Sequence, residues 1–193
     1  MPTATLLDQP LILLLHRHTL DLDGCNLLTL PRWIGQLGNL TALSVYRNRL
    51  AALLAQSRGR AQIVPIDAAL AARLAQRPDE YDALAAFASA QDFVERGLGF
   101  AALEGAQVMG AAYSSLVCRR GIEVSIFVEE RRRGRGLATA LACTLLLACL
   151  DAGREPHWDA ANPASYKLAL KLGYTFVGMY EAWYLNPDSP DYT

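Results

Sequence analysis

The sequence predicts a mixed α/β fold in which helices flank one central sheet. Short segments with apolar residues at alternate positions, typical of strands, are interspersed with longer segments of helical periodicity. Hydrophobic residues make up 52% of the 193 residues, which is enough to bury a full core. The formal net charge of -1 disfavours a general nucleic-acid binder, because displacing counterions from phosphates needs an excess of cations.

The first part of the chain contains a leucine pattern that recurs. Residues 20–22 (Leu-Asp-Leu) precede Cys25, and residues 43–45 (Leu-Ser-Val) precede Asn48 in the same phase. The pattern resembles the leucine-rich repeat, in which each unit supplies a short strand. We therefore expect residues 1–58 to form a two-repeat leucine-rich-repeat-like segment. Two units do not cover a solenoid core, so the segment would pack on the rest of the chain, on a partner protein or on a second copy.

A second unit, residues 59–193, follows a polar, glycine-containing link. Asp67 is a good N-cap for a helix, and Pro78 stops that helix. Strands are predicted from alternating apolar residues, most clearly at 121–128. In chain order we expect strands at 63–66, 100–103, 108–118, 121–128, 157–159, 174–177 and 180–185, and helices at 67–77, 79–90, 92–96, 136–152 and 163–172.

The most informative stretch, residues 128–139, joins a strand to a helix through a turn rich in glycine and arginine. The first turn of a helix leaves main-chain N–H groups unpaired, and the helix dipole adds partial positive charge. Gly134 and Gly136 let the main chain approach a phosphate closely. The pattern is neither a P-loop nor a dinucleotide-binding motif. Side chains that would add charge or a hydroxyl to this phosphate site are Arg131, Arg132, Arg133, Arg135 and Thr139.

Two signatures resemble those of the GCN5-related N-acetyltransferase (GNAT) family. Residues 133–138 (Arg-Gly-Arg-Gly-Leu-Ala) fit its Q/R-x-x-G-x-G/A signature, and residues 162–174 fit its second, an Asn leading into a helix that ends in Lys-Leu-Gly-Tyr. Residues 156–162, with Ser165, resemble the zwittermicin-resistance branch of bacterial acetyltransferases. The resemblance covers roughly residues 62–185, and it implies a GNAT domain that is an acyltransferase.

The resemblance implies acetyl-coenzyme A as the acetyl donor and no metal. Its pantetheine would pair with the strand ending at residues 126–128, and the thioester would enter between that strand and the strand at 157–159. A main-chain N–H near the end of the first strand would hold the carbonyl oxygen as charge develops. The implied cofactor-binding residues are Phe127, Val128, Arg133, Gly134, Arg135, Gly136, Leu137, Ala138, Thr139, Asn162 and Ser165.

The sequence departs from the family at the general acid. Many members place a Tyr seven residues after the second-signature Asn, and that position is Ala169 here. Ser165 and Tyr166 lie nearby on the same helix at different angles, so either is a substitute for protonating the thiolate. Because coenzyme A thiolate is a fair leaving group, water is a third alternative.

Glu123 is the candidate general base. It lies within an otherwise apolar strand, where burial would raise its pKa toward the range that a base needs. The alternative is that Glu123 faces solvent or pairs with Arg119 or Arg120. Asp159 and Glu181 are the next candidates for the base.

Metal and membrane sites are disfavoured. The four cysteines form no CxxC pair and the three histidines lack ligand spacing. Cys143 and Cys149 are expected in the core. The longest nearly apolar stretch, residues 137–150, is shorter than the ~20 residues of a membrane span, and no basic leader precedes the apolar run at 11–15. We therefore expect a cytoplasmic protein without membrane or nucleic-acid partners.

Two functions fit these observations. The first is an N-acetyltransferase that moves an acetyl group from acetyl-coenzyme A to a primary amine of a small molecule or peptide, and the intact loop favours it. The second is a protein-binding module whose repeats recognise a partner while the acetyl-coenzyme A domain acts as a sensor. The acceptor pocket would be built by residues of about 67–100 and by the final predicted strands, which carry no motif. Acidic side chains there would attract a cationic amine, although a solvated helix face explains them more simply: Asp79, Glu80, Asp82, Asp92 and Glu95.

Overall fold

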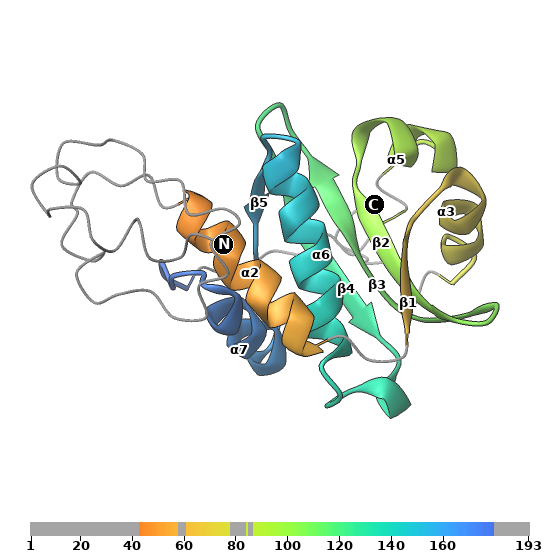
Figure 1. The fold of residues 1–193 in the computed structure, drawn as a ribbon. Helices are drawn as coiled ribbons and strands as arrows, with labels where there is room; N and C mark the ends of the chain where they lie inside the picture. Colours follow the sequence, from red (N-terminus) through yellow and green to blue (C-terminus); the bar gives the residue numbers. More distant parts are fainter. Residues whose placement is uncertain (1–42, 58–60, 78–83, 85–86, 180–193) are drawn as a thin grey trace, which may run out of the picture.

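The computed structural model describes residues 43–57, 61–77, 84 and 87–179. These residues form a five-stranded sheet in the order β1-β2-β3-β4-β5 (Figure 1). Neighbouring strands are antiparallel from β1 to β4, and β5 joins β4 in parallel. The strands are β1 (Gln62–Pro65), β2 (Gly99–Glu104), β3 (Gln107–Val117), β4 (Gly121–Val128) and β5 (Glu155–His157).

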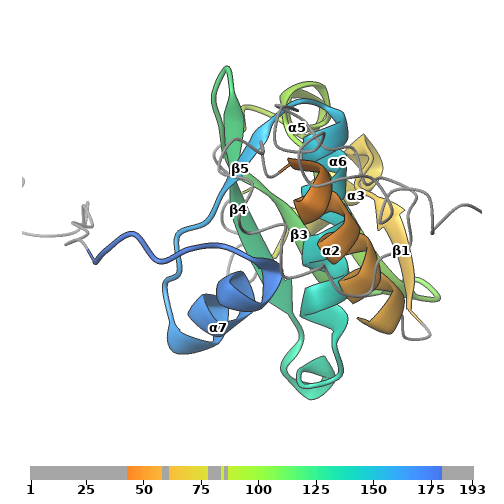
Figure 2. The ribbon, with the colours of Figure 1, turned by 60° about the vertical axis from the view of Figure 1, so that its left-hand side comes forward.

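Helices cover both faces of the sheet (Figures 1 and 2). On one face α6 (Leu137–Asp151) lies across the central strands, α2 (Leu43–Ser57) packs along α6, and α7 (Pro163–Leu172) contacts both. On the other face lie α3 (Ala68–Leu74) and α5 (Ala90–Arg96), which contact each other. A mixed sheet between two helical layers confirms the predicted α/β class.

Alternation of side chains along the strands divides the core into two clusters. On β4, Ile122 and Val124 pack with the buried side chains of α6, whereas Phe127 packs with the cluster under α3 and α5. Tyr113 and Phe93 are fully buried in that second cluster. Burying a large apolar side chain contributes about 1.5–3 kcal/mol, so the two clusters hold the sheet firmly between its helices.

Capping residues set the starts of the helices that the sequence predicts. Asp67 accepts a main-chain N–H at 2.8 Å at the start of α3. Asn162 does the same for the N–H of Ser165 at 2.9 Å at the start of α7. That helix ends at Gly173, whose φ of 110° suits glycine. The helix predicted at 163–172 is confirmed.

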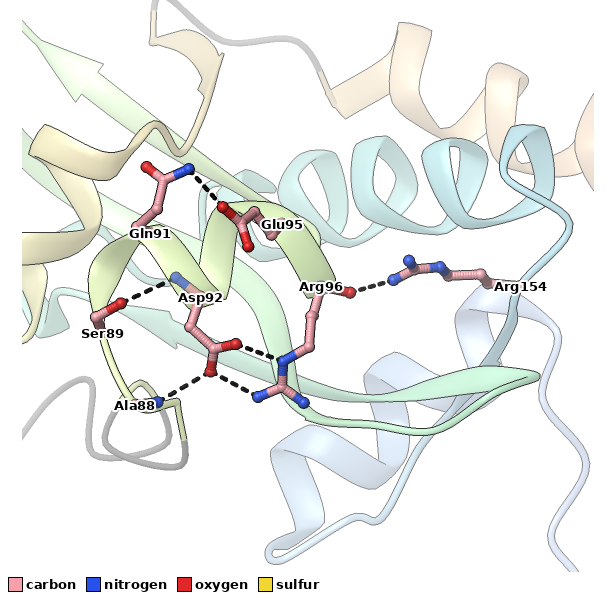
Figure 3. A network of polar contacts seen from close by, with 7 residues as sticks. All are labelled: Ala88, Ser89, Gln91, Asp92, Glu95, Arg96 and Arg154. Carbon is pink, nitrogen blue, oxygen red and sulfur yellow. Dashed lines mark hydrogen bonds and ion pairs between the residues drawn. The ribbon is translucent and has the colours of Figure 1, made fainter.

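Helix α5 is tied to the turn that follows α6 by a polar network (Figure 3). Ser89 Oγ accepts the N–H of Asp92 at 3.1 Å. The Asp92 carboxylate accepts hydrogen bonds from Arg96 at 2.6 Å and from the N–H of Ala88 at 3.0 Å. Hydrogen bonding from Arg96 lowers the pKa of Asp92. Because Arg154 donates to the Arg96 carbonyl oxygen, the network joins α5 to the turn that follows α6, although the two helices cover opposite faces of the sheet.

The strand predicted for the second leucine-rich repeat is wrong. The strand expected at 43–45 lies within α2 instead. Leu50 and Leu53, which fit the repeat phase, pack with Leu54 against α6 at the spacing of one helix face. Leucine, alanine and arginine dominate this segment and are strong helix formers, which accounts for the difference. The first repeat, within residues 1–42, lies outside the described residues.

The strand predicted at 174–177 is also wrong. The ring of Tyr174 packs against that of Trp158, with the ring centroids 5.5 Å apart. Val177 is 99% exposed, and residues 174–177 are not part of the sheet. The strand predicted at 157–159 is displaced, because β5 reaches only its first residue. Most of the predicted helix at 79–90 and all of the predicted strand at 180–185 lie outside the described residues.

Candidate functional site

Strand β4 continues beyond the point where its parallel partner ends. Pairing with β5 covers only residues 121–123, whereas β4 extends to Val128. On the side of β5, no strand of the described chain pairs with residues 124–128, although β3 pairs with them on the other side. The main chain of β4 therefore has a free edge over these residues, which we call the free β4 edge.

The direction of the main-chain groups along this edge follows from one hydrogen bond. The N–H of Glu129 donates to the carbonyl oxygen of Met109, toward β3, at 3.0 Å. Successive residues of a strand direct these groups to opposite sides. The N–H of Phe127 therefore points toward β3, and the N–H groups of Ile126 and Val128 point to the free β4 edge. Of the two predicted cofactor-binding residues on β4, Val128 is the one placed to donate there.

The turn between β4 and α6 has the geometry of an anion site. The 3-10 turn Glu130–Arg132 leads into Gly134 and Gly136, whose φ angles of 74° and 81° favour glycine. Gly136 is the N-cap of α6, and no side chain caps this helix. The N–H groups of residues 137–139 therefore have no acceptor within α6, and its dipole adds positive charge beside them. Such a group of main-chain donors is a general site for phosphate.

The four arginines of this turn are in different situations. Arg131 pairs with Glu129 at 3.0 Å, and Arg132 pairs with Glu104. Arg133 Nε donates to the carbonyl oxygen of Val128 at 3.0 Å, which folds the turn back onto the end of β4. The side chain of Arg135 is exposed and makes no ion pair or hydrogen bond within the described part of the chain. Arg135 is therefore the arginine best placed to meet an anion from solution.

The side chain of Thr139, which the sequence predicts as a phosphate ligand, bonds to α7 in the structure. Its side chain is 5% exposed, and its hydroxyl accepts a hydrogen bond from Lys171 Nζ on α7 at 3.2 Å. Leu137 and Ala138 are half-buried and pack against the core cluster of α6. These three residues can therefore offer an anion their main-chain N–H groups, while the Thr139 hydroxyl links α6 to α7.

Glu123 lies at the last residue pair between β4 and β5. Its side chain is half-buried, and its Oε1 accepts the main-chain N–H of Asp159 at 2.7 Å. Burial raises the pKa of the Glu123 carboxyl, and the negative charge of Asp159 adds to the rise, while the hydrogen bond and the charge of His157 oppose it. Arg120, an alternative partner in the sequence, pairs instead with Glu155 at 2.6 Å. The carboxyl therefore has the environment expected of a general base.

Helix α7 presents its candidate residues on different faces. Ser165 Oγ accepts a hydrogen bond from Trp158 Nε1 at 3.0 Å, on the side of the helix that faces the core. Ala169 lies one turn later on the same side and is 6% exposed. Tyr166 is exposed, and its ring contacts that of Phe176 at 5.7 Å between centroids. Of the two candidate acids, Ser165 is the one that faces inward.

Asn162, predicted as a cofactor ligand, caps α7. Its side-chain oxygen accepts the N–H groups of Ala164 at 3.1 Å and Ser165 at 2.9 Å. The side-chain oxygen is therefore committed to the helix start. The side-chain NH₂ of Asn162 is the group left to meet a ligand.

Other candidate groups are occupied by the fold. Cys143 and Cys149 are fully buried, which confirms them as core residues, and this burial raises the pKa of each thiol to about 11. Glu95 accepts a hydrogen bond from Gln91 at 3.0 Å, and Asp92 serves the cap of α5 (Figure 3). Among the described residues no group of His, Cys, Asp and Glu could hold a metal ion. None of the described helices has the length and hydropathy that a membrane span requires.

Three contributors to this region are not among the predicted site residues in the role that they have here. Trp158 holds Ser165, and Tyr174 donates its hydroxyl to the carbonyl oxygen of Pro156 at 3.0 Å, so together they fix α7 beside β5. The Lys-Leu-Gly-Tyr end of the second signature would have pointed to Tyr174. The main-chain N–H of Asp159 could not have been found, because every residue except proline has one. Glu181 lies outside the described residues.

Comparison with known proteins gives consistent results. The model of a family described as GNAT acetyltransferase matches residues 38–183. An uncharacterized N-acetyltransferase, YdfB of Bacillus subtilis (strain 168), is 35% identical over 98 residues, which are 50% of this chain and 38% of that protein. The crystal structure of a GCN5-related N-acetyltransferase-like protein from Streptococcus suis 89/1591 has a TM-score of 0.60 and 35% identity, covering 66% of this chain and 51% of the other. This chain thus spans about half, or less, of these two relatives.

More distant structures share the fold. The aminoglycoside acetyltransferase AAC(6')-Iy, in complex with the bisubstrate analogue CoA-S-monomethyl-acetylneamine, has a TM-score of 0.50 and 20% identity, covering 66% of this chain and 99% of the other. The GNAT domain of S. lividans PAT has a TM-score of 0.51 and 21% identity, covering 64% of this chain and 86% of the other. At these identities the likeness concerns the fold alone.

Proposed function

The chain belongs to the GNAT acetyltransferase family, and on that basis we propose that it transfers the acetyl group of acetyl-coenzyme A to a primary amine of a small molecule or peptide. One observation carries the proposal. The free β4 edge runs directly into a turn that ends at the uncapped start of α6. An elongated ligand with an amide-containing arm and a pyrophosphate matches this succession of groups.

The donor would bind through main-chain groups at both ends of the turn. The oxygens of its pyrophosphate would accept hydrogen bonds from the main-chain N–H groups of residues 134–139. Arg135 would supply a positive charge that is not already paired within the described chain. The pantetheine arm of the donor would run from the turn along the free β4 edge as a further strand does, past the main-chain groups of Val128 and Ile126 to the carbonyl oxygen of Val124. The positive φ angles of Gly134 and Gly136 support this fit, because they turn the chain without side chains over the site.

Transfer would then depend on position and on two proton steps. The N–H of Ile126 points to the free β4 edge on the side nearer Glu123, where it would hold the thioester oxygen as negative charge develops. Glu123 would accept the proton of the attacking amine, either directly or through a water. Nitrogen bonds to the acetyl carbon, the carbon–sulfur bond breaks, and the thiolate leaves. Ser165 is the inward-facing group that could supply its proton.

The alternative of a protein-binding module has lost part of its basis. Its second repeat would use residues 43–45 as a strand, and these residues belong to α2. We therefore retain the enzyme as the proposal, with the amine acceptor defined only by its chemical class.

Calorimetry with acetyl-coenzyme A on the wild type and on Gly136→Glu tests the site. Gly136 needs a positive φ, and a carboxylate would repel the pyrophosphate, so we expect binding to wild type and at least about a 100-fold loss in the variant. A thiol-release screen over amine classes then measures turnover. Failure of the wild type to bind acetyl-coenzyme A, with the variant behaving identically, would remove the proposal.

A further inference from the structure

The register of β4 and β5 defines where their next hydrogen bonds would form. The N–H of Glu155 donates to the carbonyl oxygen of Arg120 at 2.7 Å. In a parallel ladder this relation repeats every two residues along both strands. The N–H of His157 is then in register with the carbonyl of Ile122. The next donor along the chain, the N–H of Asp159, would be in register with the carbonyl oxygen of Val124.

The chain uses that donor differently. The N–H of Asp159 donates to Glu123 Oε1 at 2.7 Å, and residue pairing between the strands ends at Glu123 and His157. A side-chain carboxylate has therefore taken the hydrogen bond that would extend the ladder. A carboxylate acceptor gives a shorter and stronger hydrogen bond than a neutral carbonyl, so it competes well for this N–H.

A second contact draws the same segment away from β4. Trp158, between His157 and Asp159, donates its Nε1 to Ser165 Oγ on α7 and packs against Tyr174. The residues that follow β5 are therefore held by α7 through Trp158 and by the side chain of Glu123 through Asp159. Of these two, only the Glu123 contact replaces a bond of the ladder.

We propose that Glu123 is a positioning residue that ends the β4–β5 ladder and so keeps the main chain of Val124 and Ile126 open to acetyl-coenzyme A. This role is additional to proton transfer, because the bond to Asp159 uses Oε1 and leaves Oε2 to act as a base. The inference rests on the proposed function in one respect: acetyl-coenzyme A is the ligand whose affinity reports the open edge.

Two substitutions at Glu123 separate the roles. Glu123→Gln keeps a side-chain carbonyl oxygen that can accept the N–H of Asp159 but cannot act as a base. Glu123→Ala removes the acceptor, so the N–H of Asp159 is free to pair with the carbonyl of Val124. By calorimetry we expect Glu123→Gln to bind acetyl-coenzyme A within about threefold of wild type, and Glu123→Ala to bind about tenfold more weakly.

Two substitutions at Asp159 test the donor side of the same hydrogen bond. Asp159→Pro removes the donating N–H, and Asp159→Ala keeps it while removing the carboxylate. We expect Asp159→Pro to weaken acetyl-coenzyme A binding more than Asp159→Ala does. In a crystal structure of Glu123→Ala, the nitrogen of Asp159 should lie within hydrogen-bond distance, about 3.2 Å, of the carbonyl oxygen of Val124.

The outcomes distinguish this inference from the function on which it rests. If wild type binds acetyl-coenzyme A and Glu123→Ala binds it equally well with the strands parting at the same residue, the positioning role is wrong and the enzyme proposal stands. Equal losses in Glu123→Gln and Glu123→Ala would also overturn the positioning role, because the amide oxygen should rescue binding. Absence of binding in wild type would instead remove the enzyme proposal.

Discussion

The two ends of the free β4 edge are built from different kinds of groups. At the end near Val128, the available donors are main-chain N–H groups, and two glycines with positive φ angles shape the turn. At the end near Glu123, side chains from β4, α7 and the segment after β5 meet through contacts such as Trp158 to Ser165. The first end depends on backbone conformation within one short segment, whereas the second depends on residues far apart in sequence.

This difference separates the two halves of the reaction. The main-chain end suits the invariant part of the reaction, the donor, because every acetyl-coenzyme A molecule presents the same pyrophosphate and amides. The side-chain end, with Glu123 and Ser165, would face the amine and the proton transfers of the proposed reaction. Substitutions at the two ends should therefore change different kinetic constants.

The largest expected effect is on turnover at the side-chain end. Glu123→Gln should lower kcat about 100-fold while the KM for acetyl-coenzyme A stays near wild type, because the amide holds Asp159 but accepts no proton. In wild type, kcat should fall as the pH drops through the raised pKa of Glu123, since the base must be ionised. Thiol-release assays over a range of pH measure kcat and the KM for acetyl-coenzyme A in wild type and variant. A proportional rise in KM with unchanged kcat would contradict the assignment.

Restoring the family tyrosine should harm the fold. Position 169 is 6% exposed and faces the core beside Leu172, so Ala169→Tyr should lower the free energy of unfolding by about 1–3 kcal/mol through overpacking. Leu170→Tyr, at an exposed position of the same helix, is the matched control and should change stability little. Urea denaturation of both variants makes the comparison. A stable, faster Ala169→Tyr enzyme would show that space for the ring exists.

The smallest effect should appear among the arginines of the turn. Arg135 makes no ion pair within the described chain, so Arg135→Ala should raise the KM for acetyl-coenzyme A about threefold, more at low salt than at high salt. Arg131 is already paired with Glu129, so Arg131→Ala should raise it less. Steady-state kinetics at two ionic strengths test the difference. An equal response from both variants would mean that the Glu129 pair opens when the donor binds.

Sequence patterns predict the main-chain end well because its signals are local. Glycine at 134 and 136, followed by a long apolar helix, specifies a positive-φ turn and an uncapped helix start wherever the rest of the chain lies. Glu123 could be proposed in the same way, as a charge within an apolar strand. The bond from Asp159 could not, because it depends on where β5 stops.

Failures of prediction have a common physical origin. The leucines of α2 satisfy the spacing of a repeat and of a helix, and packing against α6 decides between them. Tyr174 and Phe176 lie at alternate positions as in a strand, but their rings pack against those of Trp158 and Tyr166, respectively. In both cases a short pattern has two solutions, and tertiary contacts select one.

Helix α2 also sets a limit on how far the protein can be trimmed. Leu50 is fully buried, Arg47 pairs with Asp151, and Arg49 donates to the carbonyl oxygen of Lys171 at 3.0 Å. Ser57, at its end, lies against Gly136. Removing all residues before 59 would expose the face of α6 that α2 covers, next to the proposed pyrophosphate site, so we expect the smallest folded unit to begin before α2.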